Sequence, residues 1–504
     1  MLRLYDFFVE KLFILTQKYA NNSLRKSPLI TTKSRVMRPY DVFAKRFRTK
    51  INQQKKIGLE IEIPIVTHTG EAVNYSIIRK LFLFLEKKGF QLKKENQQVY
   101  EALIYSDIVK DYPITITTDL GFSTLEIILP PCNHLHDVDQ CFKITIEYLL
   151  PFVKQQNCRL LGYGIHPFAQ PSKRLLAPKQ RYRALEKIWN TNTIVPKPMG
   201  NDGHLLTISA GNQCHIDVSE TEAIQAANVL NASSGLQIAL QANSPIWQGK
   251  RAKSYKAVRE IFYDFICANA KKRYGIPPKF ETLRGYFQFI CDQKLFLIAR
   301  NNEILQVSDY SFTEYIKQEK VTVSRLNGEK ITIVPDIEDL YYHSTLFYLN
   351  ARLVPNYGTI EVRMPCQQPP KDTMVTAALN LGLMENLAEA ESLFNQYDHT
   401  VWQELRLAAT KHGFQARLSN GKSIIPLIEQ LLAIAQKGLE SRGLGESHFL
   451  QPLFKRLDQQ QSPADVAIEI FNKKGINGLL DAVSFTEETL TNRTNQAIRQ
   501  PLYN

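Results

Sequence analysis

The stretch Gly58-Leu-Glu-Ile-Glu-Ile63 predicts a β-strand with an acidic face. Glu60 and Glu62 alternate with aliphatic side chains in this stretch. Successive residues of a strand point to opposite faces of a sheet, so both carboxylates lie on one face and the aliphatic groups on the other. A solvated outer face shows the same alternation, so this stretch alone leaves both interpretations open.

Three further strand-like segments, residues 117–128, 213–219 and 359–364, also carry acidic or basic side chains. Glutamate is a poor strand former, so its recurrence favours segments that converge on one polar concave surface. The polar side chains that these segments add are Asp119, Glu126, His215, Asp217, Ser219, Glu361 and Arg363.

Carboxylates that converge repel one another, and a divalent cation is the natural way to neutralise them. Oxygen ligands select Mg²⁺ or Mn²⁺, and one imidazole favours neither strongly. Divalent cations, an arginine and a basic loop together suit phosphoryl transfer from ATP, which depends mainly on positioning and charge neutralisation. The sequence has no P-loop and no G-x-G-x-x-G after a strand, so neither nucleotide fingerprint applies.

The local signals outside these segments predict a mixture of helices and strands. Asn74 to Lys88 reads as a helix closed by Gly89, and Ile114 to Leu129 as a strand pair or one long bent strand. Asn327-Gly328, between two strand-like runs, is a strong hairpin signal. The order lacks βαβ regularity, which favours an α+β fold with an antiparallel sheet.

The middle of the chain contains a stretch rich in proline, glycine and basic residues, 166–204, which predicts a long functional loop. We expect a strand from Leu205 to Val218. Ser219 and Glu222 have capping-box spacing, which predicts a helix running to about Ala242. From Thr373 onward the pattern is helical.

The composition is that of a globular protein: 504 residues, 44% hydrophobic and 22% charged. No run of about 18 uncharged apolar residues occurs, which argues against a membrane span. The apolar stretch Phe7 to Leu15 contains Glu10 and Lys11, which argues against a secretory signal. The seven cysteines are scattered, without a C-x-x-C pair, which favours reduced thiols in the cytoplasm over a zinc site or a disulfide framework.

The net charge of +13 comes mostly from one end of the chain. Residues 1–50 carry 12 basic and 3 acidic residues, whereas the rest carries 50 and 46. This favours a packed amphipathic helix or a solvated arm over a nucleic-acid or membrane-surface role. We therefore predict a basic helix, residues 2–19, within an N-terminal segment of residues 1–54. After this segment we predict a catalytic domain over residues 55–395. We predict a helical region over residues 396–504 that packs on that domain.

Together these segments resemble the glutamate–cysteine ligase family. Gly58-Leu-Glu-Ile-Glu62 resembles its first metal-binding strand. The segment Thr117-Thr-Asp119 through Leu125-Glu126 is similar to "TTD…LE" of the enterobacterial type, and His215-Ile-Asp-Val-Ser219 to its "HYNFS". Ile360-Glu-Val-Arg363 is similar to "IEVR" there and to "LEMR" of the plant type.

Other stretches resemble the plant type, and the resemblance is collinear from about residue 56 to about 485. The stretches are Pro178-Lys-Gln-Arg-Tyr182, Ala242-Asn-Ser-Pro245 with Gly249-Lys250, His343 with Arg352-Leu353, Lys437-Gly-Leu-Glu-Ser-Arg-Gly-Leu444, Phe449-Leu450 and Ser462-Pro-Ala-Asp465.

The resemblance implies a glutamine-synthetase-like antiparallel sheet that forms a curved, half-barrel active site with flanking helices. It also implies an ATP-dependent ligase that joins glutamate and cysteine through a γ-glutamyl phosphate, the first step of glutathione biosynthesis, with Mg²⁺ or Mn²⁺. Arg363 would contact the transferred phosphate. The implied metal ligands are Glu60, Glu62, Asp119, Glu126, His215 and Glu361, and the implied phosphate or substrate contacts are Lys179, Arg181, Lys250 and Arg352, for which a surface cation is the alternative.

The sequence departs from the plant type near its substrate-binding regions. Asp119 to Glu126 stands where the plant type has "EPGGQFELS", and the Gly-rich "RGADGGP" is replaced after Arg363 by Met-Pro-Cys-Gln-Gln-Pro369. Two alternatives therefore stay open: another carboxylate–amine ligase with a different substrate, and a catalytically silent or macromolecule-binding homologue, which the basic N-terminal segment motivates. The oligomeric state is not predicted by the sequence.

Overall fold

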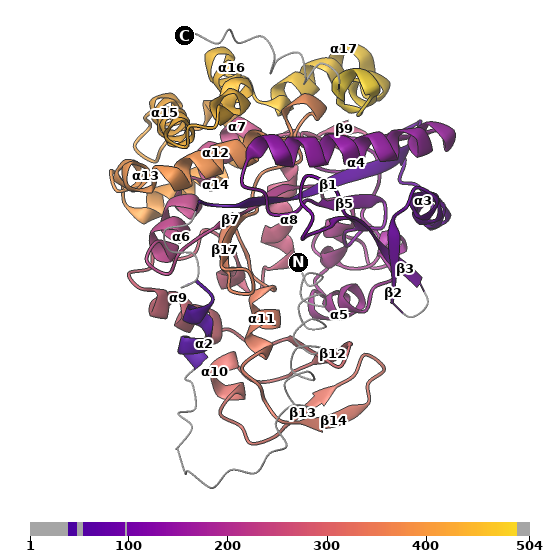
Figure 1. The fold of residues 1–504 in the computed structure, drawn as a ribbon, viewed down its shortest axis with the longest axis vertical. Coiled ribbons are helices and arrows are strands. Elements are labelled where there is room, and N and C mark those ends of the chain that lie inside the picture. Colours follow the sequence, from indigo (N-terminus) through magenta and orange to yellow (C-terminus); the bar gives the residue numbers. More distant parts are fainter. Residues whose placement is uncertain (1–38, 48–53, 96–97, 491–504) are drawn as a thin grey trace.

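A large antiparallel sheet forms the centre of the computed structural model, which describes residues 39–47, 54–95 and 98–490 (Figure 1). The predicted helix over residues 2–19 lies outside the described residues. The sheet has nine strands, which confirms the α+β class. In spatial order they are β16 (Ala351–Val354), β17 (Thr359–Val362), β7 (Asn212–Asp217), β1 (Ile57–Thr67), β5 (Thr124–Ile128), β4 (Ile114–Thr118), β3 (Gln98–Ile104) and β2 (Gln91–Glu95), with β6 (Cys158–Leu160) also paired to β1.

The alternating aliphatic residues explain why β1 lies at the middle of the sheet. Leu59, Ile61 and Ile63 are buried, and the helices that contact β1 are α4 (Leu135–Gln155) and α12 (Val375–Glu385). Burial of each such side chain stabilises the folded state by about 1.5–3 kcal/mol. Burial of the aliphatic face leaves the carboxylate face of β1 turned away from these helices.

The predicted helix after β1 and the predicted strand pair are both present. Helix α3 (Tyr75–Lys87) ends before Gly89, whose φ of 93° only glycine adopts readily. Residues 114–129 form β4 and β5 as two paired strands rather than one bent strand.

The prediction of a long loop over residues 166–204 is wrong in part, because α5 (Gln180–Ile188) and a short 3₁₀ turn, Lys173–Leu175, lie within it. The Asp202 carboxylate accepts hydrogen bonds from the backbone N–H groups of residues 193, 194 and 195 at 2.6–2.9 Å. These bonds fix the conformation of the loop after α5. The predicted strand from Leu205 is also shorter, because residues 202–208 form a 3₁₀ helix and β7 starts at Asn212.

The helix predicted after Ser219 is interrupted at Ser233. The Ser219 hydroxyl and the Glu222 carboxylate do contact each other, at 2.7 Å. The helix then divides into α6 (Ala223–Ala232) and α7 (Ser234–Gln241). The hydroxyls of Ser233 and Ser234 donate to backbone carbonyls three residues earlier. At the break, these side chains take the place of the backbone N–H donors of a regular helix.

A second, four-stranded antiparallel sheet forms the lower end of the molecule in Figure 1. Its strands pair in sequence order, and Asn327-Gly328 makes the predicted hairpin between the last two, where Gly328 has a φ of 92°. The strands are β11 (Leu297–Arg300), β12 (Glu303–Gln306), β13 (Val321–Ser324) and β14 (Lys330–Ile333).

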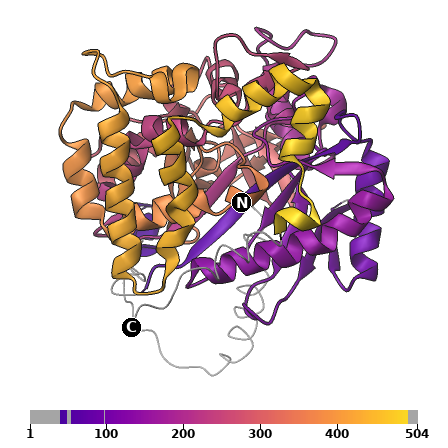
Figure 2. The same ribbon diagram turned by 90° about the horizontal axis from the view of Figure 1, so that it is seen from above.

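The C-terminal part is helical, as predicted, and packs on the rest of the chain in the upper part of Figure 1; Figure 2 views the molecule from that side. Helix α12 meets α15 so closely that a Cβ on Gly382 would lie 2.2 Å from the Ala435 carbonyl oxygen. One hydrophobic core includes residues on both sides of residue 395. The predicted domain boundary at this residue stays a prediction. The helices are α13 (Leu387–Phe394), α14 (His399–His412), α15 (Ile425–Ser441), α16 (Gln451–Gln459) and α17 (Pro463–Val483).

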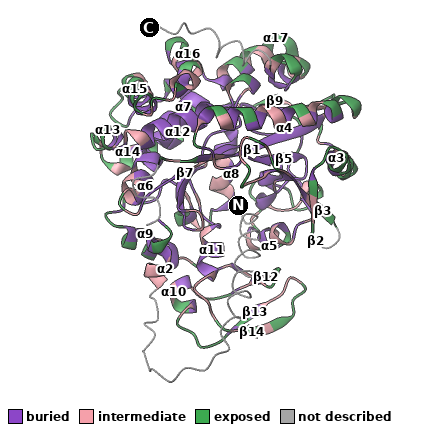
Figure 3. Ribbon diagram, viewed as in Figure 1, coloured by how far each residue is buried: buried purple, intermediate pink, exposed green. Residues whose placement is uncertain are grey.

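Burial is concentrated in the central sheet and the helices next to it, whereas exposed residues gather on the outer faces of α3 and α15–α17 (Figure 3). Helix α2 (Pro39–Lys45), from the predicted N-terminal segment, also belongs to this core, because Phe43 packs against Phe287 of α9 (Leu283–Cys291). None of the described helices has the length and apolar character needed to cross a membrane.

Candidate active site

The register of the central sheet brings the predicted site segments together on one face. Glu361 of β17 lies directly opposite His215 of β7, and Arg352 of β16 lies opposite Glu361. On the other side of β1, Glu62 lies opposite Glu126 of β5. Residues directly opposite in neighbouring strands point to the same face, so the acidic groups converge.

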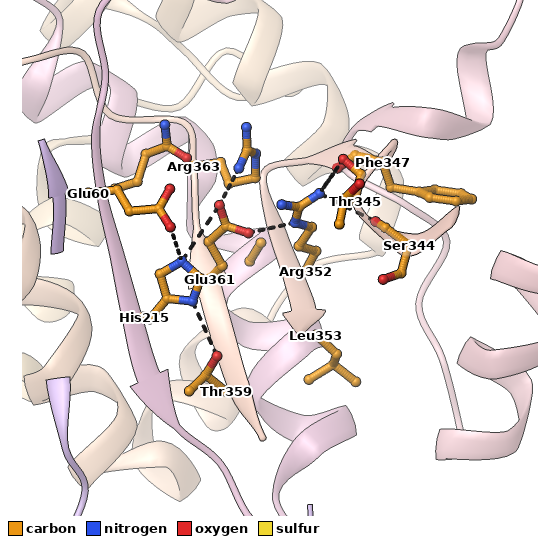
Figure 4. A network of polar contacts seen from close by, with 12 residues as sticks. Glu60, His215, Ser344, Thr345, Phe347, Arg352, Leu353, Thr359, Glu361 and Arg363 are labelled. Carbon is orange, nitrogen blue, oxygen red and sulfur yellow. Dashed lines mark hydrogen bonds and ion pairs between the residues drawn. The ribbon is translucent and has the colours of Figure 1, made fainter. Parts of the chain in front are cut away.

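Three of the predicted ligands form a compact cluster. Glu60, His215 and Glu361 each offer one ligand atom, and these atoms all lie within 4.8 Å of one another. The Nε2 atom of His215 lies 3.1 Å from Glu60 Oε1 and 3.9 Å from Glu361 Oε1 (Figure 4). Its Nδ1 atom lies 3.2 Å from the Thr359 hydroxyl, which orients the ring toward the carboxylates. Imidazole and carboxylate groups of this kind suit a divalent cation.

A second acidic group surrounds Glu62, beside the first. Its carboxylate accepts a hydrogen bond from the Gly211 N–H at 2.5 Å and one from Gln213 Nε2 at 2.6 Å. Burial and the like charge of Asp119 raise the pKa of Glu62 to about 8; Arg259 opposes this rise and Glu126 adds to it. Ionisation of Glu62 is therefore disfavoured by its surroundings, and a bound cation would favour the ionised form.

Two arginines hold the fully buried carboxylate of Glu361 from opposite sides (Figure 4). Arg352 Nε donates to Oε2 at 2.5 Å, and Arg363 donates to Oε1. Burial alone would raise the pKa of Glu361, but Arg352 and Arg363 together lower it below its ordinary value. Glu361 is therefore held as a carboxylate. The Arg363 guanidinium also lies 5.8 Å from the centre of the Tyr348 ring.

The four predicted phosphate or substrate contacts fall in different environments. Lys179 is buried, and its ammonium donates to the Thr117 hydroxyl at 3.1 Å and to the Thr118 carbonyl. Arg181 donates to the Thr345 hydroxyl at 3.1 Å.

Arg352 is only 2% exposed, so the surface-cation alternative is wrong for it. Lys250 lies exposed on the hairpin of β8 (Ile246–Trp247) and β9 (Lys250–Arg251). Among the described residues, no contact joins Lys250 to the acidic cluster.

Sequence reasoning missed Gln213 and Arg259. Gln213 precedes His215 by two residues on β7, so the alternation that identified His215 could also have found it. Arg259, on α8 (Val258–Ile266), donates to the Arg363 carbonyl at 3.1 Å. A Cβ on Gly211 would lie 2.5 Å from the NH2 atom of Arg259, so a larger residue here would displace this guanidinium. No local signal marks Arg259, because its role depends on contacts with Gly211 and Arg363, which are distant in the sequence.

Several curated proteins are similar to this chain over part of its length. A putative glutamate–cysteine ligase 2-3 of Rubrobacter xylanophilus is 24% identical over 60% of this chain and 67% of its own length. A putative glutamate–cysteine ligase 2 of Gloeobacter violaceus is 24% identical over 38% of this chain and 47% of its own length. The chloroplastic glutamate–cysteine ligase of Medicago truncatula is 24% identical over 68% of this chain and 65% of its own length. The chain thus spans about half to two thirds of these relatives.

Two solved structures are also similar. The glutamate–cysteine ligase of Francisella tularensis, in complex with AMP, aligns with a TM-score of 0.49 and 12% identity over 88% of this chain and 92% of that one. A bifunctional glutathione synthetase from Pasteurella multocida aligns with a TM-score of 0.47 and 14% identity over 91% and 54%.

The match to a family model decides the classification, because it extends over the whole central sheet and most of the helices that cover it. The model described as glutamate–cysteine ligase family 2 matches residues 56–480. This range contains every residue of the two acidic groups and both arginines of Glu361, and it agrees with the resemblance found in the sequence. The chain belongs to the glutamate–cysteine ligase family 2.

Proposed function

We propose that this chain is an ATP-dependent ligase that joins glutamate to cysteine and forms γ-glutamylcysteine. The observation that carries the proposal is the cluster of Glu60, His215 and Glu361, with Arg363 against Glu361, on one face of the sheet. Family membership supports the reaction class. The seven cysteines are all free thiols, which supports a reducing cytoplasmic setting.

The six acidic and imidazole side chains would hold Mg²⁺ or Mn²⁺ in this proposal. Glu60, His215 and Glu361 would form one site, and Glu62, Asp119 and Glu126 would contribute to a neighbouring one. The buried Gln213 carbonyl oxygen has no hydrogen-bond donor among the described residues, so it can serve as a further oxygen ligand. A bound divalent cation would neutralise negative charge on the phosphates of ATP.

Arg363 is the residue that we propose contacts the transferred phosphate. Its Nε is buried and has no acceptor among the described residues, so one donor of the guanidinium is available for an anion. The Glu361 contact and the Tyr348 ring hold the other parts of the group in place. A fixed guanidinium stabilises charge that develops on a phosphoryl group without a cost of reorganisation.

The reaction needs an activated carboxylate, because a free carboxylate is a poor electrophile. A γ-carboxylate oxygen of glutamate attacks the terminal phosphorus of ATP, the bond to ADP breaks, and a γ-glutamyl phosphate forms. The cysteine amine then attacks the carbonyl carbon, phosphate leaves, and the amine loses a proton. The role of the protein is to align these groups and stabilise charge, which fits the rigid, buried arginine–glutamate arrangement.

The loop after Arg363 bears on the alternative substrates, since it contains the two glutamines that replace the Gly-rich segment. Both are fully buried. Gln368 donates to the Gln241 carbonyl at 3.0 Å and accepts from Arg456 at 2.9 Å, and Gln367 accepts from Asn212 at 3.2 Å. These side chains join an internal polar network, so their presence does not argue for a different substrate.

ADP release by the purified full-length protein, with Mg²⁺ and ATP, tests the proposal. We expect a rise only when glutamate and cysteine are both present, together with γ-glutamylcysteine detected by mass. A rise with glutamate and another amine would replace the acceptor but keep the ligase class. No rise with any pair, from folded protein, would refute the proposal, and loss of ATP binding as well would favour the silent homologue.

A further inference from the structure

Arg352 is a buried cation whose surroundings differ from those of a ligand-binding group. Its Nε donates to Glu361 Oε2, and its NH1 group donates to the carbonyl oxygens of Thr345 and Phe347, each at 2.9 Å, and of Ser344 at 3.3 Å. These carbonyls belong to the last residue of α11 (Asp339–Ser344) and to the turn that follows it. The guanidinium thus ties that turn to the carboxylate of the cluster.

The strand that carries Arg352 lies at an edge of the sheet, yet side chains hold its outer backbone groups. Asn231 of α6 accepts from the Ala351 N–H at 2.9 Å and donates to the Ala351 carbonyl at 2.8 Å. The Leu353 N–H donates to the Tyr286 hydroxyl at 3.1 Å. Both neighbours of Arg352 in the chain are therefore anchored, which gives its side chain a fixed origin.

The two oxygens of Glu361 have different partners as a result. Oε2 accepts from Arg352, whereas Oε1 faces His215 Nε2 and accepts from Arg363 (Figure 4). A carboxylate with one oxygen held in this way cannot rotate to offer either oxygen. Oε1 is thus the oxygen presented to the cluster.

We infer that Arg352 is a positioning residue, which fixes Glu361 so that Oε1 faces Glu60 and His215, and that Arg352 touches neither phosphate nor substrate. This revises the contact role that the resemblance implied for it. The inference rests on the proposed cation site, and it assigns the recognition of phosphate to Arg363. Groups that orient metal ligands in this way typically change metal affinity by about 10–100-fold when they are replaced.

Mn²⁺ binding to the full-length protein, measured by electron paramagnetic resonance without substrates, is the direct test. Arg352→Lys keeps the charge but loses the planar fork that spans Glu361 and the turn. We expect it to weaken Mn²⁺ binding by about tenfold, and Arg352→Gln to weaken it further. At saturating Mn²⁺, we expect the KM for ATP to change by less than about twofold in the lysine variant.

Arg456→Gln is the matched control, because Arg456 is also buried, pairs with the Asp372 carboxylate at 2.6 Å and donates to the Leu240 carbonyl at 3.2 Å. Mn²⁺ affinity should be unchanged in it. Equal loss of Mn²⁺ affinity in both variants would show a general packing defect and overturn the inference.

A KM for ATP that rises in Arg352→Lys while Mn²⁺ affinity stays constant would identify a direct phosphate contact instead. If Arg352→Gln does not fold, Arg352→Lys and Tyr286→Phe, which removes only the hydroxyl that holds Leu353, decide the matter. Mn²⁺ binding without ligase turnover in the unaltered protein would refute the proposed function and leave this inference standing.

Discussion

Arg352 and Glu361 lie directly opposite each other on the neighbouring strands β16 and β17, with Arg352 Nε 2.5 Å from Glu361 Oε2. The pair is buried, and the second carboxylate oxygen faces His215 and Arg363. A charge pair in such surroundings is costly to break, because removal of one partner leaves the other uncompensated in the interior. The candidate site is therefore coupled to the stability of the sheet edge.

Glu361→Gln should remove a ligand charge while keeping the shape of the side chain. We expect ligase turnover, measured as ADP release, to fall by about two to three orders of magnitude, because the cation site and the orientation of Arg363 both depend on this carboxylate. Glu446→Gln is the control, since Glu446 is equally buried and pairs with Arg442 at 2.6 Å. It should lose stability without this loss of turnover. Normal turnover of Glu361→Gln would remove the site assignment.

Arg363→Lys should separate charge from geometry at the proposed phosphate contact. The ammonium keeps the charge but cannot contact both Glu361 and an anion in the fixed plane of a guanidinium. We expect kcat to fall by about 100-fold with a smaller change in the KM for glutamate, because the contact strengthens in the transition state. Steady-state kinetics measures both. Arg442→Lys, at a partly buried ion pair outside the acidic face, should keep kcat. A change confined to KM would contradict the proposed role.

His343 should make folding stability depend on pH in the acidic range. Burial, reinforced by the charge of Arg273, lowers the pKa of His343 to about 3, while its Nε2 lies 2.9 Å from the Ile290 carbonyl oxygen. The folded protein keeps the ring neutral, whereas the unfolded chain takes up a proton near pH 6.5. The stability from His343 is therefore complete above about pH 6.5 and is lost progressively as the pH falls toward 3.

Denaturant titrations between pH 7 and pH 4 can measure this effect. The difference in unfolding free energy between the unaltered protein and His343→Gln should shrink as the pH falls. The same difference for His68→Gln, at an exposed position, should stay nearly constant. A difference for His343→Gln that is also constant would show that the ring takes up a proton in the folded state.

Gly382→Ala should destabilise the contact between α12 and α15. The added methyl group would lie 2.2 Å from the Ala435 carbonyl oxygen, so the helices must separate. We expect a loss of about 1–3 kcal/mol in unfolding free energy. Gly285→Ala, in the exposed part of α9, meets only the Thr282 hydroxyl at 3.4 Å and should gain up to about 1 kcal/mol from helix propensity. Similar effects of both substitutions would contradict the close approach of α12 and α15.

The sequence predicted residues that the structure brings together in the candidate site, because strand periodicity is local. Alternation over residues 58–63 shows which face carries Glu60 and Glu62, and the same reasoning selects His215 and Glu361. The hairpin at Asn327-Gly328 and the helix before Gly89 were predicted for the same reason, since turn and cap conformations depend on a few neighbouring residues. The resemblance added the ligase family, which the family match confirms.

The tertiary structure decided which faces meet and in what register. Nothing local in residues 351–362 predicts that β17 lies between β16 and β7, yet this order places Arg352 beside Glu361 and Glu361 beside His215. The same packing leaves Lys250 exposed and places Arg259 next to Gly211. These contacts join segments far apart in the chain, and their free energy comes from burial and charge pairing that exist only once the sheet has closed.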